Sequence, residues 1–347
     1  MTCSLSALEQ RASTSVQPLR FNWRSTGQIG LWGLCLLIGL GGCGGTEPNP
    51  VGEAADSATA EKPIVVATST LITDWAQQVG GEEIELVSIL QPGADPHVYE
   101  PTPADTRAFE TADLILYNGY NLEPGLIRLM NAAGTAADKQ AVGEAVPPLQ
   151  LDKEGRQVPD PHVWGNAANT IQMVEAIRDA LIEQSPEDRD LFTQNADRLM
   201  AQLADLHTWI QQQTATIPVD QRKLVTTHDA FQYYAQAYGL SVAGTLIGIS
   251  TEEQPSAQTV QKLVEAIRGI GVPAIFAETT INPQLISTVA TEAQVKLADP
   301  PLYSDSIGAP GSNADSYIKM MVLNTETIVQ NLGGQITPFT VLSPPSQ

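Results

Sequence analysis

The sequence predicts an α/β protein with two lobes, each containing a parallel sheet flanked by helices, joined by one long helix. Three observations lead to this prediction. After residue 62, short apolar segments alternate with amphipathic segments, as in parallel sheets covered by helices. One apolar stripe between residues 192 and 210 is longer than the stripe of an ordinary helix. Finally, a five-residue motif with a central histidine occurs twice.

Composition narrows the class of protein. A chain of 347 residues is long enough for two domains of ordinary size. Its net charge is −21 with only 18 basic residues and no basic cluster, which disfavours nucleic-acid binding. All three cysteines, Cys3, Cys35 and Cys43, precede the predicted lobes, so we expect no disulfide within the fold.

The N-terminal segment has the features of an export signal. Arg20 and Arg24 precede the apolar run 29–40, which is too short to cross a bilayer and suits the core of a signal peptide. The following Leu40-Gly41-Gly42-Cys43 resembles the lipobox of bacterial lipoproteins. We therefore predict a lipoprotein signal peptide over 1–42, lipidation at Cys43 and a flexible tether over 43–61, which is rich in glycine, proline and small residues.

The first predicted lobe covers residues 62–184. Its predicted strands are Ile64–Ala67, Ile84–Ile89, Asp113–Tyr117 and Gln140–Ala145. Its predicted helices are Leu71–Val79, Pro103–Thr111 and Glu123–Ala132. Pro103 fits the first turn of a helix, where its missing N–H leaves no hydrogen bond unmade.

A long linking helix is predicted over 185–217. Ser185 suits the N-cap, Pro186 suits the first turn and Pro218 ends the pattern. Its apolar stripe consists of Phe192, Ala196, Leu199, Leu203, Leu206 and Ile210. About thirty helical residues span about 45 Å, so this helix is expected to connect the lobes rigidly.

The second predicted lobe covers residues 218–340. Its predicted strands are Lys223–Thr227, Ser241–Leu246, Ala274–Glu278 and Val295–Ala298. Its predicted helices are Phe231–Tyr238, Ser256–Gly269, Pro283–Glu292 and Ala314–Leu332.

Four side chains stand out as candidate metal ligands. His97 and His162 occupy the same place in the repeated motif Asp-Pro-His-Val-Tyr/Trp, His228 directly follows a predicted strand, and Asp305 follows another. Parallel sheets bind ligands beyond the carboxyl ends of their strands. Three imidazoles and one carboxylate complete the coordination of a transition-metal ion. The sequence therefore predicts a metal site in the cleft, with two ligands from each lobe.

From about residue 62 to 333 the chain resembles the metal-binding proteins of bacterial ABC importers, the zinc, manganese and iron group of TroA-like lipoproteins. The motifs that carry this resemblance are Pro96–Asp105, Asn118–Glu123, Asp160–Trp164, His228–Tyr233, Ser304–Gly308 and the helix Tyr317–Leu332. The resemblance implies that His97, His162, His228 and Asp305 stand at the family's four ligand positions.

The resemblance also implies a function and its partners. We expect a monomer, anchored by lipid to the plasma membrane and facing the periplasm, that hands a divalent ion to a permease with a separate ATPase. Manganese members often have glutamate where this chain has His228, and three imidazoles with one carboxylate suit Zn²⁺. Zn²⁺ is therefore favoured, although residues 134–159 lack the histidines that zinc importers often carry there. Mn²⁺ stays open as the alternative cargo.

Other functions remain possible from the residues alone. A zinc hydrolase needs an open coordination position, which a fourth ligand at Asp305 would close, and a surface adhesin would need no metal cleft. We therefore predict that the chain is not an enzyme. Candidates for supporting the imidazoles are Asp95, Glu100 and Asp229. Glu278 is left as a spare ligand or a neighbour of a helix cap, and His207 is expected to lie outside the site.

Overall fold

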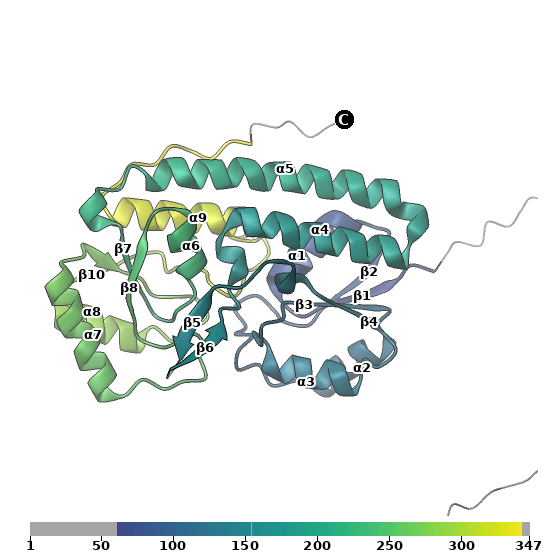
Figure 1. The fold of residues 1–347 in the computed structure, drawn as a ribbon, viewed down its shortest axis with the longest axis horizontal. Helices are drawn as coiled ribbons and strands as arrows, with labels where there is room; N and C mark the ends of the chain where they lie inside the picture. Colours follow the sequence, from purple (N-terminus) through teal and green to yellow (C-terminus); the bar gives the residue numbers. More distant parts are fainter. Residues whose placement is uncertain (1–60, 154, 342–347) are drawn as a thin grey trace, which may run out of the picture. The chain divides into compact units, whose positions relative to one another are not determined.

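The longest helix, α5 (Arg189–Thr214), runs along both lobes of the fold (Figure 1). The structure is a computed structural model and describes residues 61–153 and 155–341. The 26 residues of α5 correspond to about 39 Å of helix. The buried residues of its stripe include all six apolar positions expected from the sequence. The predicted linking helix is thus present, and it joins the two lobes.

The first lobe contains a four-stranded parallel sheet with the strand order β2-β1-β3-β4. Its strands are β1 (Ile64–Ala67), β2 (Glu85–Ser88), β3 (Leu114–Tyr117) and β4 (Asp138–Ala141). Its helices are α1 (Thr70–Gly80), α2 (Pro103–Thr111), α3 (Pro124–Ala132) and α4 (Ala167–Gln184). A hairpin of β5 (Gln150–Lys153) and β6 (Arg156–Pro159) follows β4.

Side chains that alternate along the strands are buried on both faces of this sheet. Val65 and Ala67 join the core formed with α1 and α4, whereas Val66 joins a separate core beneath α2 and α3. Successive side chains of a strand point to opposite faces, so an entirely apolar strand such as β1 must be buried on both.

The second lobe contains two parallel pairs of strands. These are β7 (Lys223–Thr226) with β8 (Ser241–Thr245), and β9 (Ala274–Ile275) with β10 (Lys296–Leu297). The N–H of Phe276 donates to the carbonyl of Val225, which joins the two pairs. The helices are α6 (Gln232–Ala237), α7 (Ala257–Ile270), α8 (Gln284–Ala293) and α9 (Tyr317–Asn331).

One apolar core continues from lobe to lobe beneath α5. It contains residues of α1 and α4 from the first lobe and of α6 and α9 from the second. Trp75 of α1 packs edge-to-face on Tyr317 of α9, with ring centroids 5.3 Å apart. The Tyr317 hydroxyl also donates to the carbonyl of Trp164. Because such interiors are close-packed, the lobes are tied to one another over a broad area.

Several predicted elements differ from the observed ones. The fourth strand covers Asp138–Ala141, and a 3₁₀ turn (Val142–Ala145) replaces the last four of its predicted residues. Strands β9 and β10 are each shorter than predicted. The linking helix begins at Arg189, because Ser185 caps the C-terminus of α4 and Pro186 starts a short 3₁₀ turn.

Helix α4 and the β5–β6 hairpin were not predicted at all. Asn166 caps α4 by accepting a hydrogen bond from the N–H of Ala168, and α4 packs along α5. The structure therefore places a second helix beside the predicted single one (Figure 1).

The predicted signal peptide, the lipidation site Cys43 and most of the tether lie outside the described residues. Within the described part of the chain, no helix has both the length and the apolar character needed to span a membrane.

Candidate metal centre

The two copies of the repeated motif share one local hydrogen bond. The Asp95 carboxylate accepts a hydrogen bond of 2.9 Å from the N–H of His97, and the Asp160 carboxylate accepts one of 3.0 Å from the N–H of His162. Aspartate side chains favour such a bond to the backbone two residues on, and the intervening proline restricts the backbone. The Asp-Pro-His sequence thus sets the local conformation of both histidines.

The other two candidates come from the second lobe. His228 lies two residues beyond β7, and its N–H donates to the Glu278 carboxylate at 2.8 Å. Asp305 lies between β10 and α9, in a segment whose Ser304 carbonyl accepts a hydrogen bond from the Trp164 indole. Each lobe therefore supplies two of the four side chains.

The four side chains converge on one small volume. One potential ligand atom from each residue lies within 4.8 Å of the others. The Nε2 atoms of His97 and His162 are 3.2 Å apart, and Asp305 oxygens lie 3.6 Å from Nε2 of His162 and 3.3 Å from Nε2 of His228. For bonds of about 2.0 Å, tetrahedral geometry requires ligand atoms about 3.3 Å apart. The spacing of these atoms already suits a four-coordinate ion.

The four polar side chains of the cluster are almost completely buried. His162 and His228 are 0% exposed, Asp305 is 1% exposed and His97 is 5% exposed. Buried polar side chains are costly unless each finds a partner. Oδ1 of Asp305 and Nε2 of His228 have no conventional hydrogen bond, although they face the shared volume. A cation bound there would satisfy both.

Two buried carboxylates contact the Nδ1 side of imidazole rings. Oδ1 of Asp160 is 2.7 Å from Nδ1 of His162, and Oε2 of Glu278 is 2.5 Å from Nδ1 of His228. Each pair leaves Nε2 directed at the shared volume. A carboxylate behind the ring favours the tautomer with its proton on Nδ1 and fixes the orientation of the ring.

The pKa values of His97 and His228 are shifted in opposite directions. Burial lowers the pKa of His97 to about 3, so its imidazole is neutral and ready to bind at neutral pH. Burial also disfavours the charged form of His228, but Glu278 and Asp305 outweigh this and raise its pKa well above the usual value. Burial opposes ionisation of Asp305 too, yet the neighbouring histidines, His228 above all, lower its pKa overall.

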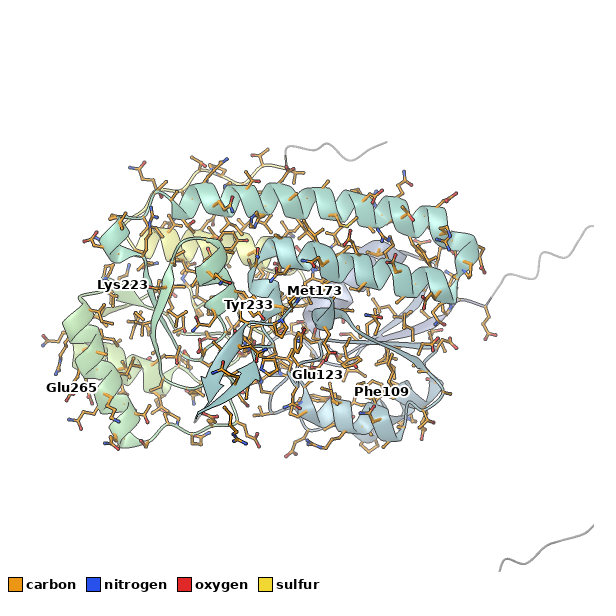
Figure 2. The ribbon with its side chains drawn as sticks, in the orientation of Figure 1. Phe109, Glu123, Met173, Lys223, Tyr233 and Glu265 are labelled. Carbon is orange, nitrogen blue, oxygen red and sulfur yellow. The ribbon has the colours of Figure 1, made fainter. Side chains whose placement is uncertain are left out.

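A third buried carboxylate lies behind the loop that carries His162. Glu123, labelled in Figure 2, accepts hydrogen bonds from the Thr68 hydroxyl and the Asn118 N–H. The Asn118 amide in turn donates to the carbonyl of Pro161, next to His162. Burial raises the pKa of Glu123 to about 7. Tyr233, also labelled in Figure 2, reaches the same loop through its hydroxyl, which donates to the Asp160 carbonyl.

The remaining sequence candidates have different positions. Asp95 holds His97 as described, whereas Asp229 bonds Gln232 and Glu100 is exposed. His207 lies on α5, where its Nδ1 is 3.2 Å from the Tyr238 hydroxyl, outside the cluster as expected.

The sequence did not single out Asp160, and it left the role of Glu278 undecided. Signals for both were present. Asp160 repeats Asp95 within the motif, and Glu278 closes a predicted strand at the same sheet edge as His228.

Two α/β lobes joined by a long helix, with side chains from both lobes enclosing one small site, define a solute-binding protein of the metal-binding type. Comparison with known proteins agrees. Residues 65–331 match the family described as zinc-uptake complex component A, periplasmic. The chain therefore belongs to this family, whose members are solute-binding components of ABC transporters, so the expectation that it is not an enzyme is confirmed.

The chain matches two bacterial lipoproteins over most of their length. The manganese-binding lipoprotein MntA of Halalkalibacterium halodurans is 32% identical over 282 residues, covering 80% of this chain and 92% of that protein. The metal ABC transporter substrate-binding lipoprotein FimA of Streptococcus parasanguinis is 33% identical over 306 residues, covering 86% and 96%.

A solved structure supports the fold. The periplasmic zinc-binding protein TroA of Treponema pallidum superposes with a TM-score of 0.75 at 33% identity, covering 78% of this chain and 99% of that one. The predicted two-lobed α/β fold is thereby confirmed. Membership of the family implies partnership with an ABC permease and its ATPase, and a place outside the cytoplasm.

Proposed function

We propose that this chain captures Zn²⁺ through His97, His162, His228 and Asp305 and delivers it to the permease of an ABC importer. The observation that carries the proposal is the spacing of the four ligand atoms. Three of the pairs lie 3.2 to 3.6 Å apart, all four atoms lie within 4.8 Å of one another, and the short distances match those of a tetrahedral ion.

The donor set favours Zn²⁺. Three imidazole nitrogens and one carboxylate are typical ligands of tetrahedral Zn²⁺, whereas Mn²⁺ prefers more oxygen ligands. Mn²⁺ is the second candidate, because the relative from Halalkalibacterium halodurans is named a manganese-binding lipoprotein. The presence of His228 among the ligands weighs for zinc.

Capture and release follow from the division of ligands between lobes. An ion bound by both lobes stabilises the arrangement in which the four side chains meet, in proportion to its preference for that arrangement. The continuous core beneath α5 opposes a wide opening. The movement that admits or frees the ion is therefore expected to be small and local.

Membrane attachment and domain bounds complete the proposal. Lipid at Cys43 and a tether over 43–61 would hold the binding protein near its permease as a monomer. The lobes would extend over 62–184 and 218–340, with 185–217 linking them. Family members are named lipoproteins, which supports this anchor.

Isothermal titration of the metal-free mature chain tests the proposal. We expect one Zn²⁺ per chain, bound more tightly than Mn²⁺, and loss of at least about 100-fold in affinity in His97→Ala and Asp305→Ala. His207→Ala is the matched control, because this histidine lies on α5 outside the cluster. Unchanged affinity in the first two variants would rule out these ligands. Elemental analysis of the protein from its native compartment then decides which metal it carries there.

A further inference from the structure

The loop between β8 and α7, residues 246–256, lies against the first lobe. Its start is anchored to its own lobe, where the N–H groups of Leu246 and Ile247 donate to the Thr227 carbonyl. Further along, the Thr251 hydroxyl donates to the Asp95 carboxylate of the first lobe at 2.6 Å. This bond crosses from one lobe to the other beside the metal centre.

Two cavities border this loop. A cavity of about 770 Å³ is bordered by Ile249 and Ser250 of the loop and by His97. A second, of about 390 Å³, is bordered by Ile247 and Gln254 of the loop and by Asp95. Residues of the loop thus line both cavities, and Thr251 and Asp95 both border the smaller one.

The two copies of the Asp-Pro-His motif differ in their surroundings. In the second copy Oδ1 of Asp160 binds both the N–H and the ring of His162, and the next residue, Val163, is fully buried. In the first copy one Asp95 oxygen binds the N–H of His97 and the other accepts the bond from Thr251, while Val98 is 47% exposed. His162 is built into the core, whereas His97 lies at the edge.

His97 is also the ligand nearest to solvent. It is the most exposed of the four, and it borders the larger cavity. An ion leaving the cluster towards that cavity must lose its bond to His97. The position of His97 depends on Asp95, and Asp95 is held in turn by Thr251.

We propose that Thr251 is a positioning residue that holds the His97 turn against the second lobe through Asp95 and thereby sets the rate at which the bound ion leaves. The inference rests on the proposed function, because it takes His97 as a ligand. It assigns the exit side of the site to the cavity bordered by His97, Ile249 and Ser250.

Stopped-flow release of Zn²⁺ from the full mature chain to an excess of a chelating dye measures this rate. Thr251→Val keeps the shape of the side chain and removes its donor. We expect release to be about tenfold faster, the lower end of the effect of losing one hydrogen bond to a charged group, because the site is partly exposed. Thr251→Ser restores the hydroxyl and should release at the wild-type rate. Thr288→Val, which removes an exposed hydroxyl bonded only within its own helix, is the control.

A double-mutant cycle locates the effect. In an Asp95→Ala background, Thr251→Val should add no further acceleration, because the acceptor is already absent. A wild-type release rate in Thr251→Val, equally fast release in the valine and serine variants, or full additivity with Asp95→Ala would each overturn the proposal. Absence of Zn²⁺ binding by the unmodified chain would instead overturn the proposed function, so the two failures are distinguishable.

Discussion

Substitution of Glu278 tests whether this carboxylate holds the His228 imidazole in the orientation and protonation state that bind the ion. Its carboxylate accepts the N–H of His228 at 2.8 Å and lies 2.5 Å from Nδ1 of the same residue. Glu278→Gln keeps the shape of the side chain but replaces one acceptor oxygen with a donor NH₂ group. One of the two His228 groups must then face a donor instead of an acceptor.

The expected loss of Zn²⁺ affinity follows from that mismatch. A hydrogen bond to a charged group contributes about 1.5–3 kcal/mol, which corresponds to about 10- to 100-fold in affinity. Changes to groups that orient metal ligands have effects of the same size. We therefore expect Glu278→Gln to bind Zn²⁺ about 10- to 100-fold more weakly at high pH.

The loss should shrink as pH falls. The carboxylates around His228 raise its pKa well above the usual value, so protons compete with the ion in the unmodified protein. Removing the Glu278 charge lowers that pKa and weakens the competition. The variant therefore recovers part of its deficit at pH 6.5 relative to pH 8.5, which a purely structural defect would not reproduce.

Competition titration with a chelating dye at both pH values measures these affinities. Asp74→Asn is the matched control, because Asp74 also accepts a backbone N–H, that of Tyr317, but is not part of the ligand cluster. Equal affinity of Glu278→Gln and the unmodified chain at pH 8.5, or a deficit as large in Asp74→Asn, would refute the reasoning.

Three further predictions concern the same region. His228→Glu adds an oxygen ligand and should move the preference towards Mn²⁺ by about tenfold or more in paired titrations; an unchanged ratio would contradict the choice by donor type. Zn²⁺ binding near pH 7 should release about one proton, that of His228, seen as a dependence of the binding heat on buffer ionisation enthalpy; no such dependence would contradict its raised pKa. Burial raises the pKa of Glu123 to about 7 from 4.5, so its contribution to stability is complete below pH 4.5 and is lost as pH rises through 7. As pH rises from 4.5 to above 7, the free energy of unfolding of the metal-free protein should therefore fall by about 3 kcal/mol because of Glu123, and Glu123→Gln should lack this fall. Denaturant titrations measure it, and identical pH profiles of the two proteins would oppose this.

Local signals in the sequence were strong enough to predict many elements. Strand β1 and helix α2 have the predicted bounds, because β1 is wholly apolar and Thr102, Pro103 and Asp105 form a complete helix start. The predicted start of the linking helix was wrong, because a proline such as Pro186 suits the first turn of an α-helix and of a 3₁₀ helix equally. Helix α4 has a cap and an apolar face, yet its many buried positions give a weaker periodic pattern than α5.

The sequence by itself determined the four candidate donors, because the repeated Asp-Pro-His motif and the strand ends place three histidines and one aspartate at sheet edges. Only the tertiary structure decided which side chains support those donors. Glu278 meets His228 across 50 residues of chain, and Thr251 meets Asp95 across 156. Such contacts depend on how the two lobes pack beneath α5, and no local pattern encodes that packing.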